Sequence, residues 1–352
     1  MMSNPYTMIF GKEPSQMIPR NLQSSQILDA FTSEYESNTM FMITGLRGSG
    51  KTVLLSEIAN KLRKDPSWIV IDLNTQTDMR KSMISFLSHE KSFIHKVKPT
   101  EVNISVLGLG MEIKDNNQIE DDDYTLISML ETIKKNKKKV LVTIDEASNT
   151  SNMRVFAMTY QILIRRQLPV YLLMTGLYEN ISELQNVDNL TFLYRAPKIP
   201  LKSLDIRMIA ENYATNFHLE AEEARKMARM TKGYSYAFQV LGYLTWNNGG
   251  SYKEVIDDYR QYLNEYVYHK IWSELSETDR KIAYGIAKVK SGKIRDIRGF
   301  LKIETNQFNP YRRRLIKKGL VDGETYGYVS FTLPLFDQFV IDIYEEDFDQ
   351  LP

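Results

Sequence analysis

The feature that most limits the possible folds is a glycine-rich loop between a short apolar segment and an amphipathic one. The loop spans residues 45–52 and reads Gly-Leu-Arg-Gly-Ser-Gly-Lys-Thr. It matches the pattern G-x-x-x-x-G-K-[ST], whose glycines let successive backbone N–H groups point at phosphate oxygens. Residues 40–44 predict a buried strand before it, and residues 52–63 predict a helix after it, whose N-terminus favours an anion. The order of strand, loop and helix therefore predicts a nucleoside-phosphate site in an α/β domain.

The side chains of this loop are expected to have different tasks. Lys51 would reach the β- and γ-phosphates and so assist catalysis, and Thr52 would ligate Mg²⁺. Arg47 is a candidate for a further phosphate contact, and the alternative is an exposed side chain at a variable loop position. The predicted nucleotide-binding residues are Gly45, Leu46, Arg47, Gly48, Ser49, Gly50, Lys51, Thr52 and Val53.

A second motif, Asp145-Glu146, directly follows an apolar run at residues 140–144. Such a run is typical of a strand in a parallel sheet that is covered on both faces. Ligands bind at the carboxyl ends of these strands, so Asp145 is predicted to hold Mg²⁺, mainly through water. Glu146 is predicted to act as the general base toward the attacking water. The alternative is that the pair only caps the next helix.

Two further polar residues end apolar segments. Thr175 follows residues 170–174 and is a candidate for contact with the γ-phosphate or the attacking water. The alternative is a threonine that caps the next turn. Asn74 follows residues 68–73 and is a weaker candidate for orienting Glu146.

Strand-length apolar runs alternate with helical spacing up to about residue 200. Besides the segments above, residues 191–194 predict a last, weaker strand, and residues 103–113 an extended insertion. This alternation predicts a doubly wound, parallel-sheet α/β domain. The pattern then becomes helical. We expect three domains, at 1–200, 201–268 and 269–352.

Composition excludes several classes of site. The 352 residues include no cysteine, which rules out disulfides and thiolate sites, and the net charge of +1 restricts any nucleic-acid contact to a local patch. No run of about 18 apolar residues is present to span a bilayer. The expected location is the cytoplasm.

The glycine loop, the Asp145-Glu146 pair and Thr175 after an intervening strand together resemble the additional-strand catalytic-glutamate class of P-loop ATPases. Within it the chain resembles archaeal-type ATPases, which are close to STAND ATPases, to AAA+ proteins and to initiators of the origin-recognition type. Residues 10–14 with Arg20 resemble the segment near the adenine in those proteins, and residues 199–204 resemble the start of their helical lid. Residues 231–236 with Gln239 resemble their lid motif. The resemblance implies ATP as the nucleotide, with Mg²⁺.

The chain departs from these families at three places. Initiator ATPases usually carry a lid arginine where Tyr236 stands, and STAND proteins tend to have a proline where Ser235 stands. AAA+ rings place an arginine finger before the last core strand, and residues 185–189 contain no arginine. These departures favour a slow switch over a ring-forming motor.

The C-terminal residues predict a winged helix. Helices are expected at 279–288 and 294–300 and after Thr305 or Asn309, with Pro310 in the first turn of the third helix. A hairpin follows, with its turn at 323–327. Three helices and a hairpin form the winged variant of the helix-turn-helix.

Basic residues cluster on the third of these helices, as contact with DNA phosphates requires. They are Arg312, Arg313, Arg314, Lys317 and Lys318. The first hypothesis is therefore an ATP-driven switch whose winged helix binds double-stranded DNA. The alternative is a regulatory or signalling scaffold in which the winged helix binds a protein partner or acts as an internal brake, without DNA.

Overall fold

The computed structural model describes residues 3–8, 14–33, 37–90 and 122–349. The predicted insertion at 103–113, and residues 10–13 of the segment assigned to the adenine, lie outside these ranges. The chain divides into two compact units. The sheet unit comprises Asn21–Thr44 and Leu54–Ile199, and the loop–helix unit comprises Met1–Arg20, Gly45–Val53 and Pro200–Pro352. The glycine loop thus packs with the C-terminal segments, and the three-domain division stays a prediction.

The sheet unit is built on a five-stranded sheet in the order β2-β3-β4-β1-β5. The pairs β1–β4, β3–β4 and β2–β3 are parallel. The strands are β1 (Met40–Thr44), β2 (Trp68–Leu73), β3 (Lys139–Ile144), β4 (Val170–Gly176) and β5 (Lys198–Pro200). Because β4 lies between β1 and β3, the predicted additional strand between the two motif-bearing strands is confirmed.

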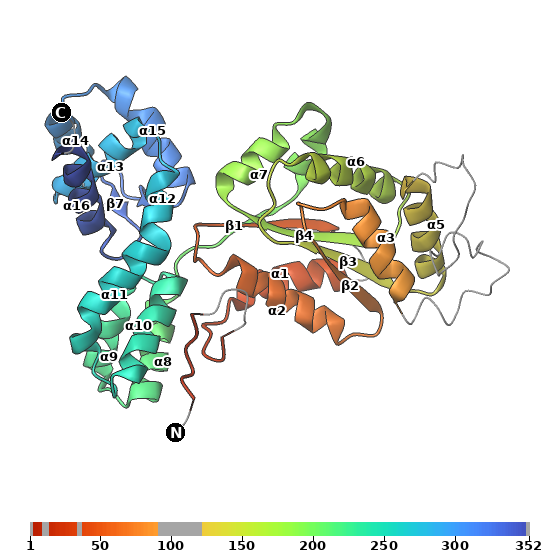
Figure 1. Cartoon of the computed structure of the whole chain (residues 1–352), viewed down its shortest axis with the longest axis horizontal. Coiled ribbons are helices and arrows are strands. Elements are labelled where there is room, and N and C mark those ends of the chain that lie inside the picture. The colour runs from red at the N-terminus through yellow and green to blue at the C-terminus, as the bar shows by residue number, and fades with distance from the viewer. Residues whose placement is uncertain (1–2, 9–13, 34–36, 91–121, 350–352) are drawn as a thin grey trace. The chain divides into compact units, whose positions relative to one another are not determined.

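Helices cover both faces of this sheet (Figure 1). They are α1 (Asn21–Thr32), α2 (Lys51–Arg63), α3 (Met79–His89), α5 (Asp122–Lys135), α6 (Ser151–Arg165) and α7 (Tyr178–Gln185). On one face, Phe31 of α1 packs edge-on against Phe41 and Tyr171 of the strands. On the other, a continuous apolar core joins the sheet to α3, α5 and α6. Burial of both faces explains why the strands are apolar throughout instead of alternating.

The predicted strand at 191–194 is wrong. Those residues lie in η2 (Asp188–Arg195), a 3₁₀ helix, and the last strand is β5. The helix is kinked at Leu190, whose φ of −114° is not helical, and the side chains of Leu190 and Leu193 are both fully buried in the core of the sheet unit. The short apolar run fits a helix face as well as a strand.

The loop–helix unit continues from residue 200 as a helical segment, as predicted. Its elements are α8 (Ile206–Phe217), α9 (Ala221–Met230), α10 (Ser235–Asn247), η3 (Tyr252–Val255), α11 (Ile256–Leu263), η4 (Asn264–Tyr268) and α12 (His269–Ser273). The first described residues pack on it: Tyr6 stacks on Phe217 and its hydroxyl donates to Asn212 at 2.7 Å. We call residues 201–268 the lid segment.

The C-terminal part follows the predicted order of three helices and a hairpin. Its elements are α13 (Glu277–Lys288), α14 (Ile294–Leu301), α15 (Thr305–Lys317), β6 (Val321–Asp322), β7 (Ser330–Phe331) and α16 (Phe336–Asp349). An antiparallel bridge joins Lys293, just before α14, to Tyr328, just before β7. None of the helices among the described residues is long and apolar enough to cross a membrane.

The start of α15 differs from the prediction. Glu304 caps the helix through a capping box with Gln307, so Pro310 lies inside the helix and not in its first turn. The box at Glu304 begins the helix six residues before the proline, where two N–H groups gain side-chain acceptors.

Candidate nucleotide site

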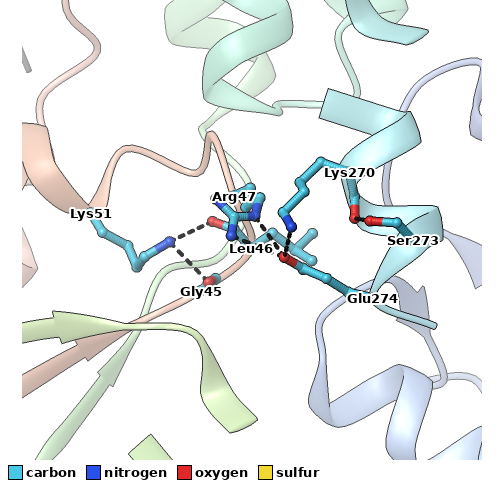
Figure 2. A network of polar contacts seen from close by, with 7 residues as sticks. All are labelled: Gly45, Leu46, Arg47, Lys51, Lys270, Ser273 and Glu274. Atoms are coloured by element: carbon cyan, nitrogen blue, oxygen red, sulfur yellow. Dashed lines mark hydrogen bonds and ion pairs between the residues drawn. The ribbon is translucent and has the colours of Figure 1, made fainter. Parts of the chain in front are cut away.

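The glycine loop has the backbone of an anion-binding nest. Gly48 and Gly50 have φ of 67° and 90°, whereas the residues between and around them do not have positive φ. This alternation turns successive N–H groups toward one side. Lys51, the first residue of α2, folds back over the loop and donates to the carbonyls of Gly45 and Leu46 at 3.1 and 2.7 Å (Figure 2). The ammonium is therefore held at the loop itself, as a phosphate ligand needs to be.

The carbonyl side of the same loop is held by the start of α10. The Tyr234 hydroxyl donates to the carbonyl of Arg47 at 2.6 Å, and the Ser235 hydroxyl to that of Ser49 at 2.9 Å. Between them, the backbone N–H of Tyr236 donates to the carbonyl of Gly48 at 3.0 Å. Three consecutive loop carbonyls thus accept from three consecutive residues, and an N–H at the start of α10 gains a partner.

The approach of Tyr234 explains the glycine at position 48. A Cβ at Gly48 would collide with the Tyr234 hydroxyl and lie 2.9 Å from the Tyr236 Cβ. Burial raises the pKa of Tyr234 well above its ordinary value, so the hydroxyl keeps its proton and remains a donor.

Arg20 ties this arrangement to the N-terminal segment. Its guanidinium donates to the carbonyls of Ser49 and Lys202 at 3.0 and 2.9 Å. Burial lowers its pKa to about 10, which leaves it charged at neutral pH. Arg20 therefore fixes the loop from a second direction.

The side chain of Arg47 extends from the loop to Glu274, which follows α12. Their ion pair measures 2.9 Å, and Lys270 lies 3.5 Å from the same carboxylate oxygen (Figure 2). No feature of the sequence indicated Glu274, because the pair joins residues 227 positions apart.

In the sheet unit, the Asp145-Glu146 turn follows β3 and meets the end of β4. Glu146 has φ of 53°, a conformation that costs a residue with a side chain about 1–2 kcal/mol. Its N–H donates to the Thr175 hydroxyl at 3.0 Å and to Asp145 at 3.2 Å. The Thr175 hydroxyl in turn donates to Asp145.

These bonds change the task of Thr175. It is fully buried, and a hydroxyl has one proton, which here goes to Asp145. In this structure the hydroxyl therefore positions the acidic turn, and a contact of Thr175 with the γ-phosphate or the attacking water stays a prediction. Asn74 has another task too, since its side-chain oxygen accepts from the N–H of Gln76 at 2.8 Å.

The roles of the other predicted site residues stay predictions. Thr52 and Val53 occupy the first turn of α2 in the loop–helix unit, whereas Asp145 belongs to the sheet unit. That Thr52 and Asp145 share one Mg²⁺ stays a prediction. Gly45 lies close to Ser49, whose hydroxyl would be 2.6 Å from a Cβ at that glycine.

Of the five cations proposed for DNA, Arg314 has a structural partner. Its guanidinium pairs with Asp279 at 2.6 and 2.9 Å and donates to Ser276 at 2.8 Å. Asp279 is only 2% exposed. Arg314 therefore joins α15 to the start of α13, and a contact of its partly exposed guanidinium with DNA stays a prediction.

The remaining four differ in exposure. Arg313 and Lys317 are exposed, one turn apart on α15, whereas Arg312 and Lys318 are half-buried. The accessible basic surface of this helix is therefore narrower than the run of charges in the sequence indicates.

Comparison with known proteins finds an ATPase family over the part of the chain that contains the loop and the acidic turn. Residues 27–173 match the family described as an ATPase domain predominantly from Archaea. The chain contains an archaeal-type P-loop ATPase domain. The protein is therefore an ATP-hydrolysing enzyme, as predicted. Residues 265–340 match a family described as a domain of unknown function. No curated protein matches the chain.

Solved structures share the fold of this ATPase. A Walker-type ATPase of Pyrococcus abyssi is 16% identical, with a TM-score of 0.63, over 92% of this chain and 96% of that one. The ORC2 protein of Aeropyrum pernix, in ADPNP-ADP complexes, is 14% identical, with a TM-score of 0.59, over 96% of each chain. At these identities the likeness shows the fold.

Proposed function

We propose that this ATPase is a nucleotide-driven switch in which ATP at the glycine loop sets the state of the C-terminal helices. The observation that carries this proposal is the hold of α10 on three consecutive loop carbonyls. The carbonyls of Arg47 and Ser49 belong to the peptide units that carry the N–H groups of Gly48 and Gly50, which a nest directs at phosphate, whereas the N–H of Ser49 donates to the carbonyl of Leu46 at 3.3 Å. A change on one side of the loop therefore acts directly on the other.

ATP binding uses groups that the loop already positions. The N–H groups of the nest and the start of α2 attract the phosphates, and Lys51 adds a positive charge. Mg²⁺ suits the predicted ligands because it prefers oxygen donors, which the hydroxyl of Thr52 and the carboxylate of Asp145 supply. When bound, the ion would neutralise phosphate charge.

Hydrolysis is assigned to Glu146. Its side chain is exposed at the end of β3, while its backbone is fixed by Thr175 and Asp145. A carboxylate so fixed is suited to orient and deprotonate an attacking water. The lid segment has no arginine at Tyr236 to stabilise the transition state, so we expect slow turnover.

Two variants test the assignment. Lys51→Ala is expected to abolish ATP binding, and Glu146→Gln to retain ATP binding while slowing hydrolysis about 100-fold or more. Binding is measured by calorimetry and turnover by phosphate release. To test the switch, hydrogen exchange of α10 and α12 is compared with ATP and with ADP bound to Glu146→Gln. Equal exchange in both nucleotide states would contradict the switch but leave the ATPase assignment intact.

We further propose that the C-terminal part is a winged helix that binds double-stranded DNA through α15. The bridge between Lys293 and Tyr328 supports the fold assignment, because a winged helix pairs a short strand before its second helix with the hairpin. The observation that favours DNA is the exposure of Arg313 and Lys317 on one face of α15. Phosphate contacts need cations that are accessible in this way.

A salt series separates DNA binding from the alternative of a scaffold or internal brake. The doubly substituted Arg313→Ala/Lys317→Ala protein should lose about two units of slope in a plot of log affinity against log salt concentration. The control is Lys226→Ala, which removes one exposed positive charge from α9 and should leave the slope unchanged. No binding at low salt, or an unchanged slope, would favour the alternative, in which the winged helix contacts protein and not DNA.

A further inference from the structure

The glycine loop carries an arginine that is held by a carboxylate outside the loop. Arg47 donates to Oε1 of Glu274 through Nη2 at 2.9 Å and through Nε at 3.3 Å. Lys270, one helical turn before Glu274, lies 3.5 Å from the same oxygen (Figure 2). Glu274 thus contacts two cations with a single negative charge, and it retains Lys270 as a partner if Arg47 leaves.

This ion pair is easily exchanged. The two side chains are 34% and 30% exposed, so water screens their attraction, and such a pair shifts an equilibrium by about fivefold at most. The γ-phosphate of ATP carries more negative charge than a carboxylate and has three acceptor oxygens. A guanidinium can engage it through two parallel hydrogen bonds. Phosphate is therefore the stronger of the two partners for Arg47.

The backbone of Arg47 is placed for that exchange. The residue lies inside the loop that forms the phosphate nest, directly before Gly48. Its carbonyl is held by the Tyr234 hydroxyl at 2.6 Å, so the side chain can turn without moving the main chain. Arg47 is thus a second cation of the loop, beside Lys51, whose ammonium contacts the carbonyls of Gly45 and Leu46.

We propose that Arg47 distinguishes ATP from ADP by exchanging Glu274 for the terminal phosphate. The inference rests on the proposed function, since it requires ATP at the glycine loop. ADP has no γ-phosphate and leaves the pair with Glu274 in place. Glu274 stands two residues before Ser276, the residue that caps α13. The exchange therefore releases a contact at the joint between α12 and α13.

Three substitutions test this exchange through the ratio of the affinities for a non-hydrolysable ATP analogue and for ADP, each with Mg²⁺, measured by calorimetry. Glu274→Gln weakens the competitor and should raise the preference for the ATP analogue by up to about fivefold. Arg47→Ala should lower it by about tenfold or more, since a hydrogen bond to a charged group is lost. Lys270→Ala leaves Arg47 as the main partner of Glu274 and should lower the preference by up to about twofold.

The opposite signs distinguish this proposal from a structural role of the pair. Glu274→Gln removes the ion pairs with Arg47 and Lys270, and Lys270→Ala removes the second of them, so a structural effect would change the preference in the same direction. In an Arg47→Ala background, Glu274→Gln should have no effect on the ratio. The control is Glu222→Gln, which removes the carboxylate of another exposed ion pair, with Lys226 at 3.2 Å on α9.

Two results would overturn the exchange: equal changes in both affinities, or an effect of Glu274→Gln that persists without Arg47. If either result is obtained with an unaltered protein that binds both nucleotides and hydrolyses ATP, the exchange is wrong but the proposed function is not contradicted. If the unaltered protein binds neither nucleotide, the proposed function fails with it.

Discussion

Thr175 provides the sharpest test of the acidic turn. Its hydroxyl donates to Asp145 and accepts the N–H of Glu146, and its side chain is fully buried. Thr175→Val keeps the volume and shape of the side chain and removes only these two bonds. A hydrogen bond to a charged group contributes about 1.5–3 kcal/mol, and Asp145 is half-buried, so we expect a loss of about 2 kcal/mol in the stability of the sheet unit.

The same substitution should reduce turnover. Glu146 is held in a left-handed conformation by bonds to Thr175 and Asp145, and one of the two remains in the valine variant. The general base would then be less well fixed, and a displacement of about 1 Å lowers a rate by about 100-fold. We expect kcat to fall by about 10- to 100-fold, with ATP affinity changed less than about threefold.

Thr175→Ser is the matched control. It keeps the hydroxyl and loses a buried methyl group, which costs about 1 kcal/mol of stability. Stability is measured by thermal denaturation and turnover by phosphate release from ATP. The serine variant should therefore be somewhat less stable but nearly as active as the unaltered protein. If serine and valine lose activity equally, or if valine keeps full activity, the positioning role of the hydroxyl is wrong.

Two further substitutions test contacts of the loop–helix unit. Tyr234→Phe removes the donor to the carbonyl of Arg47 and should weaken the binding of ATP and of ADP about three- to tenfold, as measured by calorimetry. The control is Tyr252→Phe, which removes a hydroxyl bonded elsewhere in the lid segment and should leave both affinities unchanged. Asp279→Asn removes the charge that Arg314 pairs with; because Arg314 is 41% exposed, we expect a loss of only about 1–3 kcal/mol, seen as a lower melting temperature with normal ATP turnover. A melting temperature equal to that of the unaltered protein would show that the pair contributes little.

The sequence alone was sufficient for the strands β1 to β4, because the local pattern and the tertiary environment agree there, but not for β5. The strands at 40–44 and 68–73 have the predicted bounds. The segment at 191–194 shows the limit of this reasoning, since two buried leucines three residues apart are compatible with more than one backbone. Only the packing of η2 on the core decides between them.

The site was predictable where chemistry follows from residue order, and not where distant segments meet. The loop and the acidic turn can be predicted from their sequence motifs. The tasks of Thr175, Tyr234 and Glu274 depend on contacts with residues 30, 187 and 227 positions away. No spacing rule reports such contacts. The run of basic residues on α15 likewise gave no indication that Arg314 pairs with Asp279, which lies 35 positions away.

The way in which the lid segment contacts the loop accounts for the missing lid arginine. Tyr236 approaches the loop with its backbone N–H and not with a long cationic side chain, so it contacts a carbonyl and not a phosphate. A peptide unit whose carbonyl accepts a hydrogen bond becomes a better donor at its own N–H, by about 10–30% per bond. The donors from α10 therefore strengthen the N–H groups of Gly48 and the residues after it toward phosphate. By reciprocity, phosphate at those N–H groups strengthens the hold of α10 on the loop. We therefore expect nucleotide affinity and lid contact to be linked through the loop backbone itself, and the exchange proposed for Arg47 would add the distinction between ADP and ATP.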